Sequence, residues 1–279
     1  MTFPSRAWGT SPASRAPISN GFPDRPTTRP GHSSKPHLWE LRSQPKSADN
    51  YSYLTRRARA AHKRGFTLAY SVKTNPSPTV LGLVRKLGLL AETINVAECR
   101  AATAAGWKAS DLILNGPGKR WPTDSVPRGL FALICESVDE FRRSLDEEAQ
   151  HRFVGFRIRT PGVESRMGLD LTDRAVVSGA VDALRTARCQ GVEVAIHAHR
   201  RGSSYSGVTR WWESMMAVIR YARDLAEASK TTIPCLDLGG GFDEQGLDAL
   251  LTSPVGDEVA EYVQRELPAC RVVVLEQCH

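Results

Sequence analysis

A short apolar run ends on a lysine that could act as a nucleophile. Leu68 to Val72 contains few polar residues, which indicates a buried strand, and Asn75-Pro76 then breaks regular structure. Lys73 is therefore expected at the carboxyl end of a strand. In a parallel α/β barrel this end carries the catalytic residues, and a partly desolvated lysine there can lose its proton and attack a carbonyl carbon. The alternative is an ordinary surface lysine, because most lysines are exposed.

A glycine triplet follows a second apolar strand far downstream. The run from Ile233 to Leu238 leads directly into Gly239, Gly240 and Gly241. Three residues without Cβ atoms let backbone N–H groups approach a phosphate closely. A barrel places its phosphate site after the last strands, and this triplet follows the seventh predicted strand. Together with Lys73, the triplet predicts a phosphate-binding catalytic site at one end of a barrel.

Further motifs occur in an order that resembles a known family. They are Tyr70-Ser71-Val72-Lys73-Thr74-Asn75, Glu92 with Glu98, Arg157, Ser165-Arg166-Met167-Gly168, His197-Ala198-His199, Gly239 to Phe242, and Glu276. From about residue 50 to residue 279 the set is similar to that of the pyridoxal-phosphate-dependent ornithine, diaminopimelate and arginine decarboxylases, which are relatives of alanine racemase. Each motif is modest alone, and it is their common order that carries the resemblance.

The resemblance implies pyridoxal 5'-phosphate as the cofactor. Lys73 matches the family's Schiff-base lysine, and Gly239 to Gly241 match its phosphate loop. Glu276 matches the glutamate that meets the pyridine nitrogen, where a carboxylate keeps the nitrogen protonated. Standing alone, Glu276 would be interpreted as a solvated acid.

Other positions are implied to line the cofactor pocket. His199 matches the histidine that stacks on the ring, although either histidine of the pair could instead be a satisfied residue at a barrel mouth. Ser203 or Ser204 matches a serine near the phosphate, with one residue added to the usual spacing. Arg157 matches a pocket-lining position, as do Glu92 and Glu98, and a salt-bridge network would explain these three nearly as well.

Near its end the chain departs from the family pattern. The family's Glu-Pro-Gly-Arg motif reads Glu276-Gln277-Cys278-His279, so that a histidine replaces the phosphate-binding arginine. The resemblance also implies a C-terminal β-domain that completes the active site across a dimer interface, and it is absent from this sequence. We therefore expect a decarboxylase barrel truncated after strand eight, a homodimer only for a full-length chain, and exposed apolar surface on strand eight because its covering helix is missing.

The predicted function is pyridoxal-phosphate-dependent decarboxylation of a basic amino acid or diaminopimelate, with ornithine, lysine, arginine and diaminopimelate left open as small-molecule substrates. One alternative is a truncated or degenerate protein that binds the cofactor without turnover. Another is a cofactor carrier related to alanine racemase. Because the implied C-terminal catalytic domain is lacking, whether this chain is an enzyme is left open.

The elements that must position these residues alternate along the chain. Strands are predicted at residues 66–72, 89–96, 111–115, 130–135, 153–158, 192–197, 235–238 and 271–275. Helices are predicted at residues 49–64, 77–88, 97–105, from about 138, 175–189, 211–228 and 258–265, the first with Arg56, Arg57 and Arg59 on its charged side. Eight strands alternating with helices favour a parallel (β/α)8 TIM-type barrel. An open doubly wound sheet is the alternative, but no G-x-G-x-x-G turn follows the first strand.

The domain organisation follows from a change in composition. Residues 1–48 form a Pro/Ser/Arg-rich segment that we expect to be a disordered tail, either a leader or an extension from a misplaced start, and residues 49–279 form the barrel. Residues 1–65 hold 12 Lys and Arg against 3 Asp and Glu, whereas the remainder holds 25 against 27. The net charge of +7 therefore belongs to the N-terminal part, which argues against a nucleic-acid partner for the folded body.

The cysteines and the hydropathy pattern indicate the compartment. The six cysteines show no C-x-x-C spacing, so we expect reduced thiols and no metal site. No window approaches 18 uninterrupted apolar residues and no secretory apolar region opens the chain, so we expect no membrane partner and a cytoplasmic location.

Overall fold

The computed structural model describes residues 49–119, 126–146, 150–159, 166–200, 208–242 and 244–277. The predicted tail at residues 1–48 lies outside the described residues, as do Ser165, Ser203, Ser204 and Cys278-His279.

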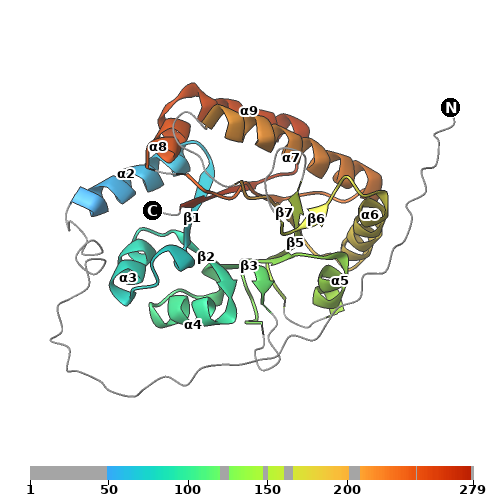
Figure 1. Cartoon of the computed structure of the whole chain (residues 1–279), viewed down its shortest axis with the longest axis horizontal. Helices are drawn as coiled ribbons and strands as arrows, with labels where there is room; N and C mark the ends of the chain where they lie inside the picture. The colour runs from blue at the N-terminus through green and yellow to red at the C-terminus, as the bar shows by residue number, and fades with distance from the viewer. Residues whose placement is uncertain are drawn as a thin grey trace, which may run out of the picture. The chain divides into compact units, whose positions relative to one another are not determined.

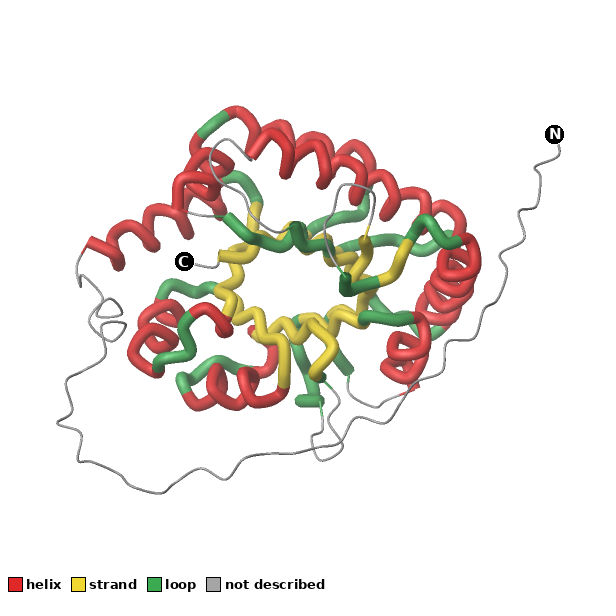
Figure 2. Tube along the Cα trace, in the orientation of Figure 1, coloured by secondary structure: helices red, strands yellow, loops and turns green. Residues whose placement is uncertain are grey.

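Eight parallel strands close into a barrel. They are β1 (Phe66–Ser71), β2 (Leu90–Asn95), β3 (Leu112–Gly118), β4 (Ala132–Cys135), β5 (Phe153–Arg159), β7 (Val194–His197), β8 (Cys235–Asp237) and β9 (Val272–Gln277). Neighbours pair in this order, and β9 pairs with β1 to complete the ring that Figure 2 shows. The two-residue strand β6 (Leu169–Asp170) pairs with β5 outside this ring. The predicted TIM-type barrel is confirmed.

Helices form the outer layer around the barrel (Figure 1). They are α2 (Asp49–Lys63), α3 (Pro78–Lys86), α4 (Val96–Ala104), α5 (Val138–Asp146), α6 (Arg174–Cys189), α7 (Val208–Ser229), α8 (Glu244–Thr252) and α9 (Pro254–Glu266), with single 3-10 turns at η1 (Val72–Thr74) and η2 (Ala109–Asp111). Among the described helices, none combines the length and apolar character that crossing a membrane requires.

Three local features differ from the sequence predictions. β3 continues through Gly118, whereas the strand was expected to end at Asn115 before a Gly-Pro-Gly loop. β6 is too short to produce a periodic pattern. α8 was also missed, because a single residue, Ser253, separates it from α9; the Ser253 hydroxyl caps α9 by accepting from Val255 N at 3.4 Å.

Alternation along the strands divides the core into two clusters. The smaller cluster lies inside the barrel and consists of Ala69, Leu90, Ile113, Phe131, Ala132, Ile134, Phe153, Ala195, Cys235 and Val274. The larger cluster lies between the strands and the helices. Side chains two residues apart on a strand point to the same face, so each strand supplies both clusters.

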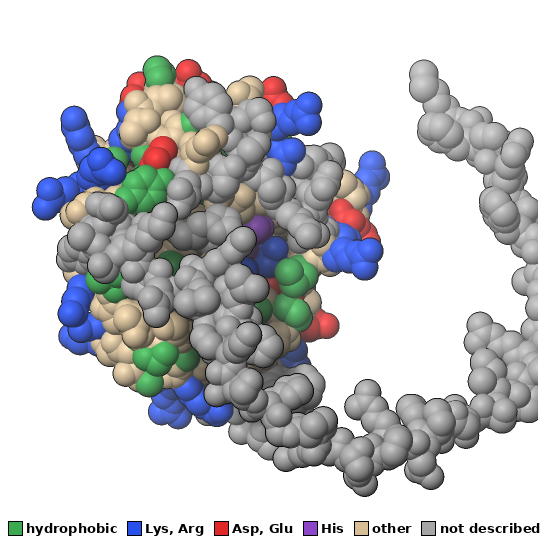
Figure 3. Space-filling view, turned by 60° about the vertical axis from the view of Figure 1, so that its left-hand side comes forward, with side chains coloured by type: hydrophobic (Ala, Val, Ile, Leu, Met, Phe, Trp, Pro, Cys, Tyr) green, Lys and Arg blue, Asp and Glu red, His purple; other side chains and the backbone are tan. Residues whose placement is uncertain are grey.

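The expected exposure of strand eight is wrong. Val273 and Leu275 of β9 are buried and belong to the same cluster as Ala61 of α2. Helix α2 precedes β1, which is the neighbour of β9 in the closed ring, and α2 contacts both β1 and α8. The outward side chains of β9 are therefore covered, although no helix follows this strand among the described residues. On the face shown in Figure 3, the described Lys and Arg side chains are scattered among other groups.

Candidate active site at the carboxyl ends of the strands

The inward-facing rows of the barrel end on polar residues. Arg157 pairs in register with His197, and His197 with Asp237. Asp237 pairs with Val274, which lies inside the barrel, and Glu276 follows two residues later on the same face. We call this set the polar ring: Ser71, Glu92, Asn115, Glu136, Arg157, His197, Asp237 and Glu276. One polar side chain from each strand end thus lies directly above the apolar cluster inside the barrel.

Lys73 lies on η1, immediately beyond β1, and faces a buried carboxylate. Its Nζ atom is 3.9 Å from Glu92 Oε2, and its side chain is 42% exposed whereas that of Glu92 is 1% exposed. The hydroxyl of Ser71 also donates to Glu92 Oε2. Glu92 Oε1 is buried and has no hydrogen-bond partner among the described residues. An accessible amine therefore lies beside a carboxylate that is already desolvated.

Glu98 lies outside the polar ring, in the first turn of α4. Its carboxylate accepts from Ile94 N at 3.0 Å and from Asn95 Nδ2 at 3.1 Å, while Asn95 caps the helix by accepting from Glu98 N at 2.8 Å. Burial raises the pKa of Glu98, and repulsion from Glu92 acts in the same direction. These bonds give Glu98 a structural role at the start of α4.

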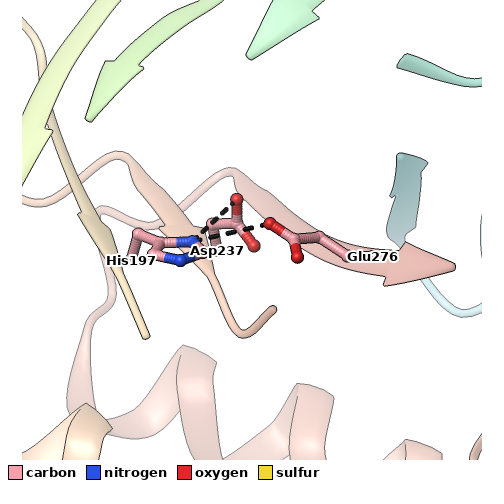
Figure 4. Close-up of side chains that lie close together, drawn as sticks. All are labelled: His197, Asp237 and Glu276. Atoms are coloured by element: carbon pink, nitrogen blue, oxygen red, sulfur yellow. Dashed lines mark ion pairs between the residues drawn. The ribbon is translucent and has the colours of Figure 1, made fainter. Parts of the chain in front are cut away.

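His197, Asp237 and Glu276 form a buried cluster within the polar ring. His197 and Glu276 point toward each other from β7 and β9, with Asp237 of β8 between them (Figure 4). His197 Nδ1 lies 3.1 Å from Asp237 Oδ2 and 3.7 Å from Glu276 Oε1. Asn115 Nδ2 donates to Glu276 Oε1 at 3.5 Å. Glu276 is thus held by a donor from β3, and His197 of β7 lies within ion-pair distance of both buried carboxylates.

His199 follows β7 and lies nearer the solvent. Its Nε2 atom is 3.9 Å from Glu276 Oε2, and its side chain is 20% exposed. Burial lowers the pKa of His199 to about 3, and the charges of His197, Arg157 and Lys73 act in the same direction. His199 is therefore a neutral imidazole, with one accessible part, beside a buried carboxylate.

The glycine triplet turns tightly between β8 and Phe242. Gly239 adopts φ +64°, and a Cβ atom there would lie 2.5 Å from the carbonyl oxygen of Ala198. A Cβ atom on Gly240 would lie 2.3 Å from the carbonyl oxygen of Glu276. Gly239 N donates to Asp237 Oδ1 at 2.9 Å, and Glu276 N donates to Gly239 O at 2.8 Å. The first two glycines are thus needed to bring this loop against the backbone after β7 and at β9.

The structure brings most of the predicted site residues to one end of the barrel. Lys73, His199, Glu276 and the triplet Gly239, Gly240 and Gly241 all lie at or beyond the carboxyl ends of strands. Arg157 lies there as well, 3.9 Å from Glu136. The predicted serine, Ser203, lies outside the described residues.

The members of the polar ring that received no role in the sequence analysis include Asn115, Asp237 and the inner histidine, His197. Each is preceded two residues earlier by an apolar residue that faces the barrel interior: Ile113, Cys235 and Ala195. The sequence therefore contained a signal for these members of the polar ring. It is an apolar residue that is followed, two positions later at the end of a strand, by a polar residue. Its meaning depends on knowing which face of each strand is inside.

Comparisons with known proteins agree with this geometry. A family model described as "Pyridoxal-dependent decarboxylase, pyridoxal binding domain" matches residues 52–275. An L-glutamyl-[BtrI acyl-carrier protein] decarboxylase from Niallia circulans is 26% identical over 227 residues, covering 73% of this chain and 52% of that protein. A diaminopimelate decarboxylase from Bacteroides thetaiotaomicron is 34% identical over 195 residues, covering 63% and 49%.

A lysine/ornithine decarboxylase from Selenomonas ruminantium is 27% identical over 234 residues, covering 80% of this chain and 56% of that protein. The chain thus spans about half the length of these curated relatives. Among solved structures, a diaminopimelate decarboxylase from M. jannaschi gives a TM-score of 0.61 at 21% identity, covering 82% of this chain and 59% of that one, which shows the shared fold. Because the family model spans most of the sequence, the chain belongs to the pyridoxal-dependent decarboxylases and carries their pyridoxal-binding domain.

Proposed function

We propose that this chain is the cofactor-binding barrel of a decarboxylase that acts on a basic amino acid or on diaminopimelate. The observation that carries the proposal is the arrangement at the polar ring, where accessible Lys73 lies beside buried Glu92 and neutral His199 lies beside buried Glu276. Family membership supports the cofactor, and the substrate class is inferred from relatives named for diaminopimelate, lysine and ornithine.

The side chains present fit pyridoxal phosphate. A lysine amine, a buried carboxylate and a glycine loop are the groups that such a site requires. Lys73 would hold the cofactor aldehyde covalently, and Glu276 would receive the pyridine nitrogen. Gly240 and Gly241 would present their backbone N–H groups to the phosphate. The N–H of Gly239 would not take part, because it already donates to Asp237.

The remaining proposed contacts come from β5 and from beyond β7. His199 would pack on the ring, with Arg157 lining the pocket and Ser203 near the phosphate. We further propose that a homodimer forms in a chain that also carries a C-terminal domain.

Each of these residues has a physical task in decarboxylation. The bound cofactor supplies an electron sink for the bond between the α-carbon and the carboxylate. Glu276 stabilises a proton at the pyridine nitrogen, because a buried carboxylate favours a neighbouring cation. His199 adds no positive charge next to that nitrogen, since its low pKa keeps it neutral. Glu92, 3.9 Å from Lys73, helps to hold the lysine side chain at this end of the barrel by electrostatic attraction.

The proposal is tested by trapping the cofactor and locating it. Purified protein is incubated with pyridoxal phosphate, reduced with borohydride and digested, and the modified peptide is identified by mass spectrometry. We expect the adduct on Lys73 and its loss in Lys73→Ala. Lys86→Ala is the matched control, because Lys86 is an exposed lysine at the end of α3 and should leave the adduct unchanged.

Turnover is measured separately, as release of labelled carbon dioxide from carboxyl-labelled ornithine, lysine, arginine and diaminopimelate. Release from one of these, dependent on Lys73, supports the full proposal. An adduct on Lys73 without release from any substrate would instead favour a cofactor-binding protein without turnover. An adduct confined to another lysine would contradict the assignment of Lys73.

A further inference from the structure

We propose that His197, anchored by Asp237, is a positioning residue that fixes the Glu276 carboxylate for the pyridine nitrogen of the cofactor. The inference rests on the proposed function, which assigns Glu276 to that nitrogen, and it adds two residues to which no role has been given so far. Neither would touch the cofactor itself. Both act through the carboxylate that does.

Asp237 is held by the backbone around it. Its Oδ1 atom accepts from Gly239 N at 2.9 Å, and its own carbonyl oxygen accepts from Ala198 N at 2.9 Å. Its other carboxylate oxygen, Oδ2, lies 3.1 Å from His197 Nδ1. Because Asp237 is 2% exposed and fixed on two sides, it defines the orientation of the imidazole.

The position of His197 Nδ1 determines where its proton must lie. The side chains of His197, Asp237 and Glu276 are all at most 3% exposed, and their ligand atoms lie within 4.8 Å of one another. Two carboxylates this close in a buried site repel each other. His197 Nδ1 lies within ion-pair distance of Asp237 Oδ2 and Glu276 Oε1, and a hydrogen on this nitrogen offsets the repulsion electrostatically, so the geometry favours a proton on Nδ1.

The donors around Glu276 also distinguish its two oxygens. Oε1 lies 3.7 Å from His197 Nδ1 and receives the Asn115 amide at 3.5 Å. Oε2 is the oxygen directed toward His199, at 3.9 Å. Since His199 is the residue proposed to pack on the ring, Oε2 is the atom aimed at the pyridine nitrogen. His197 and Asn115 therefore hold Oε1 of Glu276, and this orients Oε2 toward the pyridine nitrogen.

The test compares two ligands that differ at one atom. Equilibrium binding is measured for pyridoxal 5'-phosphate and for its analogue with C–H in place of the ring nitrogen, which cannot use Glu276. We expect wild-type protein to prefer pyridoxal phosphate. In His197→Leu we expect the preference to fall roughly tenfold, because one charge-assisted hydrogen bond corresponds to about one power of ten in affinity. Affinity for the analogue should stay unchanged.

A conservative variant separates orientation from packing. In His197→Asn the amide nitrogen lies near the position of Nδ1 and can donate to the same carboxylates, so the preference for pyridoxal phosphate should be largely restored. Asp237→Asn should lower the preference as well, because the imidazole loses its anchor. This variant also keeps the test valid if His197→Leu does not fold, as judged by circular dichroism. His62→Leu, at an exposed position, is the control and should leave the preference for pyridoxal phosphate unchanged.

The outcomes separate this inference from the proposed function. If wild-type protein does not distinguish the two ligands, the contact between Glu276 and the nitrogen is wrong, and the role of His197 fails with it. If wild type distinguishes them and His197→Leu does so equally well, only the role of His197 is overturned. If His197→Leu bound both ligands equally more weakly than wild type, the role of His197 would also be overturned, because the result would show a general loss of structure. The role of His197 would also be overturned if dialysed wild type retained a divalent cation that His197→Leu lost. His197, Asp237 and Glu276 would then be metal ligands.

Discussion

His199 is a histidine whose protonation is controlled by its surroundings. In an unfolded chain a histidine has a pKa of about 6.5. In the folded protein burial and three nearby cationic or titratable groups lower the pKa of His199 to about 3. Neutrality would suit the role proposed for His199 against the cofactor ring, but it lowers the stability of the folded protein at low pH.

We therefore expect His199 to make folding pH-dependent in the cofactor-free protein. Between pH 6.5 and about 3 the unfolded chain binds a proton at this residue and the folded chain does not. The free energy of unfolding thus decreases as the pH falls, by at most about 1.4 kcal/mol per pH unit, and is unaffected by His199 above this window. Between pH 7 and pH 5, wild type should lose about 1–2 kcal/mol more than His199→Gln, as measured by urea unfolding.

The exposed histidine of α2 provides the control for this measurement. His62→Gln should lose as much free energy of unfolding as wild type between the two pH values, because His62 lies at the surface. If His199→Gln and wild type lost equal amounts, the imidazole of His199 would have to be protonated in the folded protein. Its assignment as a neutral ring would then be wrong.

At the scale of elements, the loop after β8 depends on glycine for two separate reasons. A residue with φ +64° at position 239 is unfavourable for any L-amino acid with a side chain. In addition, a Cβ atom there would collide with the carbonyl oxygen of Ala198, 2.5 Å away. The loop is pressed between the ends of β7 and β9, where Gly239 N donates to Asp237 Oδ1.

A matched pair of substitutions separates these two reasons. Gly191 adopts φ +70° between α6 and β7, and a Cβ atom added there would meet no other atom within 4 Å, so Gly191→Ala should cost only the conformational term of about 1–2 kcal/mol. Gly239→Ala should cost clearly more, roughly 3 kcal/mol or above, and should weaken cofactor binding. Urea unfolding measures both. Equal losses in the two variants would show that the loop can move away from Ala198 freely.

At the scale of the whole molecule, α2 joins the beginning of the described chain to the last part of the barrel. Arg57 Nε lies 2.7 Å from Asp248 Oδ1, and the two residues are separated by 191 positions in sequence. The hydroxyl of Tyr53 donates to Asp248 Oδ2 at 2.9 Å, and the Arg57 guanidinium stacks 3.9 Å from the Tyr53 ring centre. This contact holds α2 and α8 together next to the seam between β9 and β1.

We expect Arg57→Ala to lower the free energy of unfolding by about 1–3 kcal/mol. The Arg57 side chain is 3% exposed, which makes its loss costly, but Asp248 is 41% exposed, so solvent screening reduces the strength of the pair. Arg59→Ala on the same helix is the control and should change stability by less than about 0.5 kcal/mol, because Arg59 is exposed. Thermal or urea unfolding distinguishes the two. Equal, small effects would show that α2 is held by its apolar side alone.

The sequence by itself determined the architecture and most of the elements. Apolar strands alternating with amphipathic helices predicted the parallel barrel, and Lys73 was correctly expected immediately beyond the first strand, because a Pro-containing break follows a buried run. The glycine triplet and the pair of histidines were likewise located by local pattern. Such features depend on residues near each other in the chain, so a single sequence contains them.

Only the tertiary structure decided which side chains meet. The ring of polar residues exists because parallel strands in register place Arg157, His197 and Asp237 in one row, and barrel closure then brings Glu276 of the last strand to His197 and Asn115. The burial of Arg57, expected on the charged side of its helix, was decided in the same way by contact with Asp248. These contacts join residues far apart in sequence, and their geometry depends on the register and closure of the whole sheet, which no local pattern specifies.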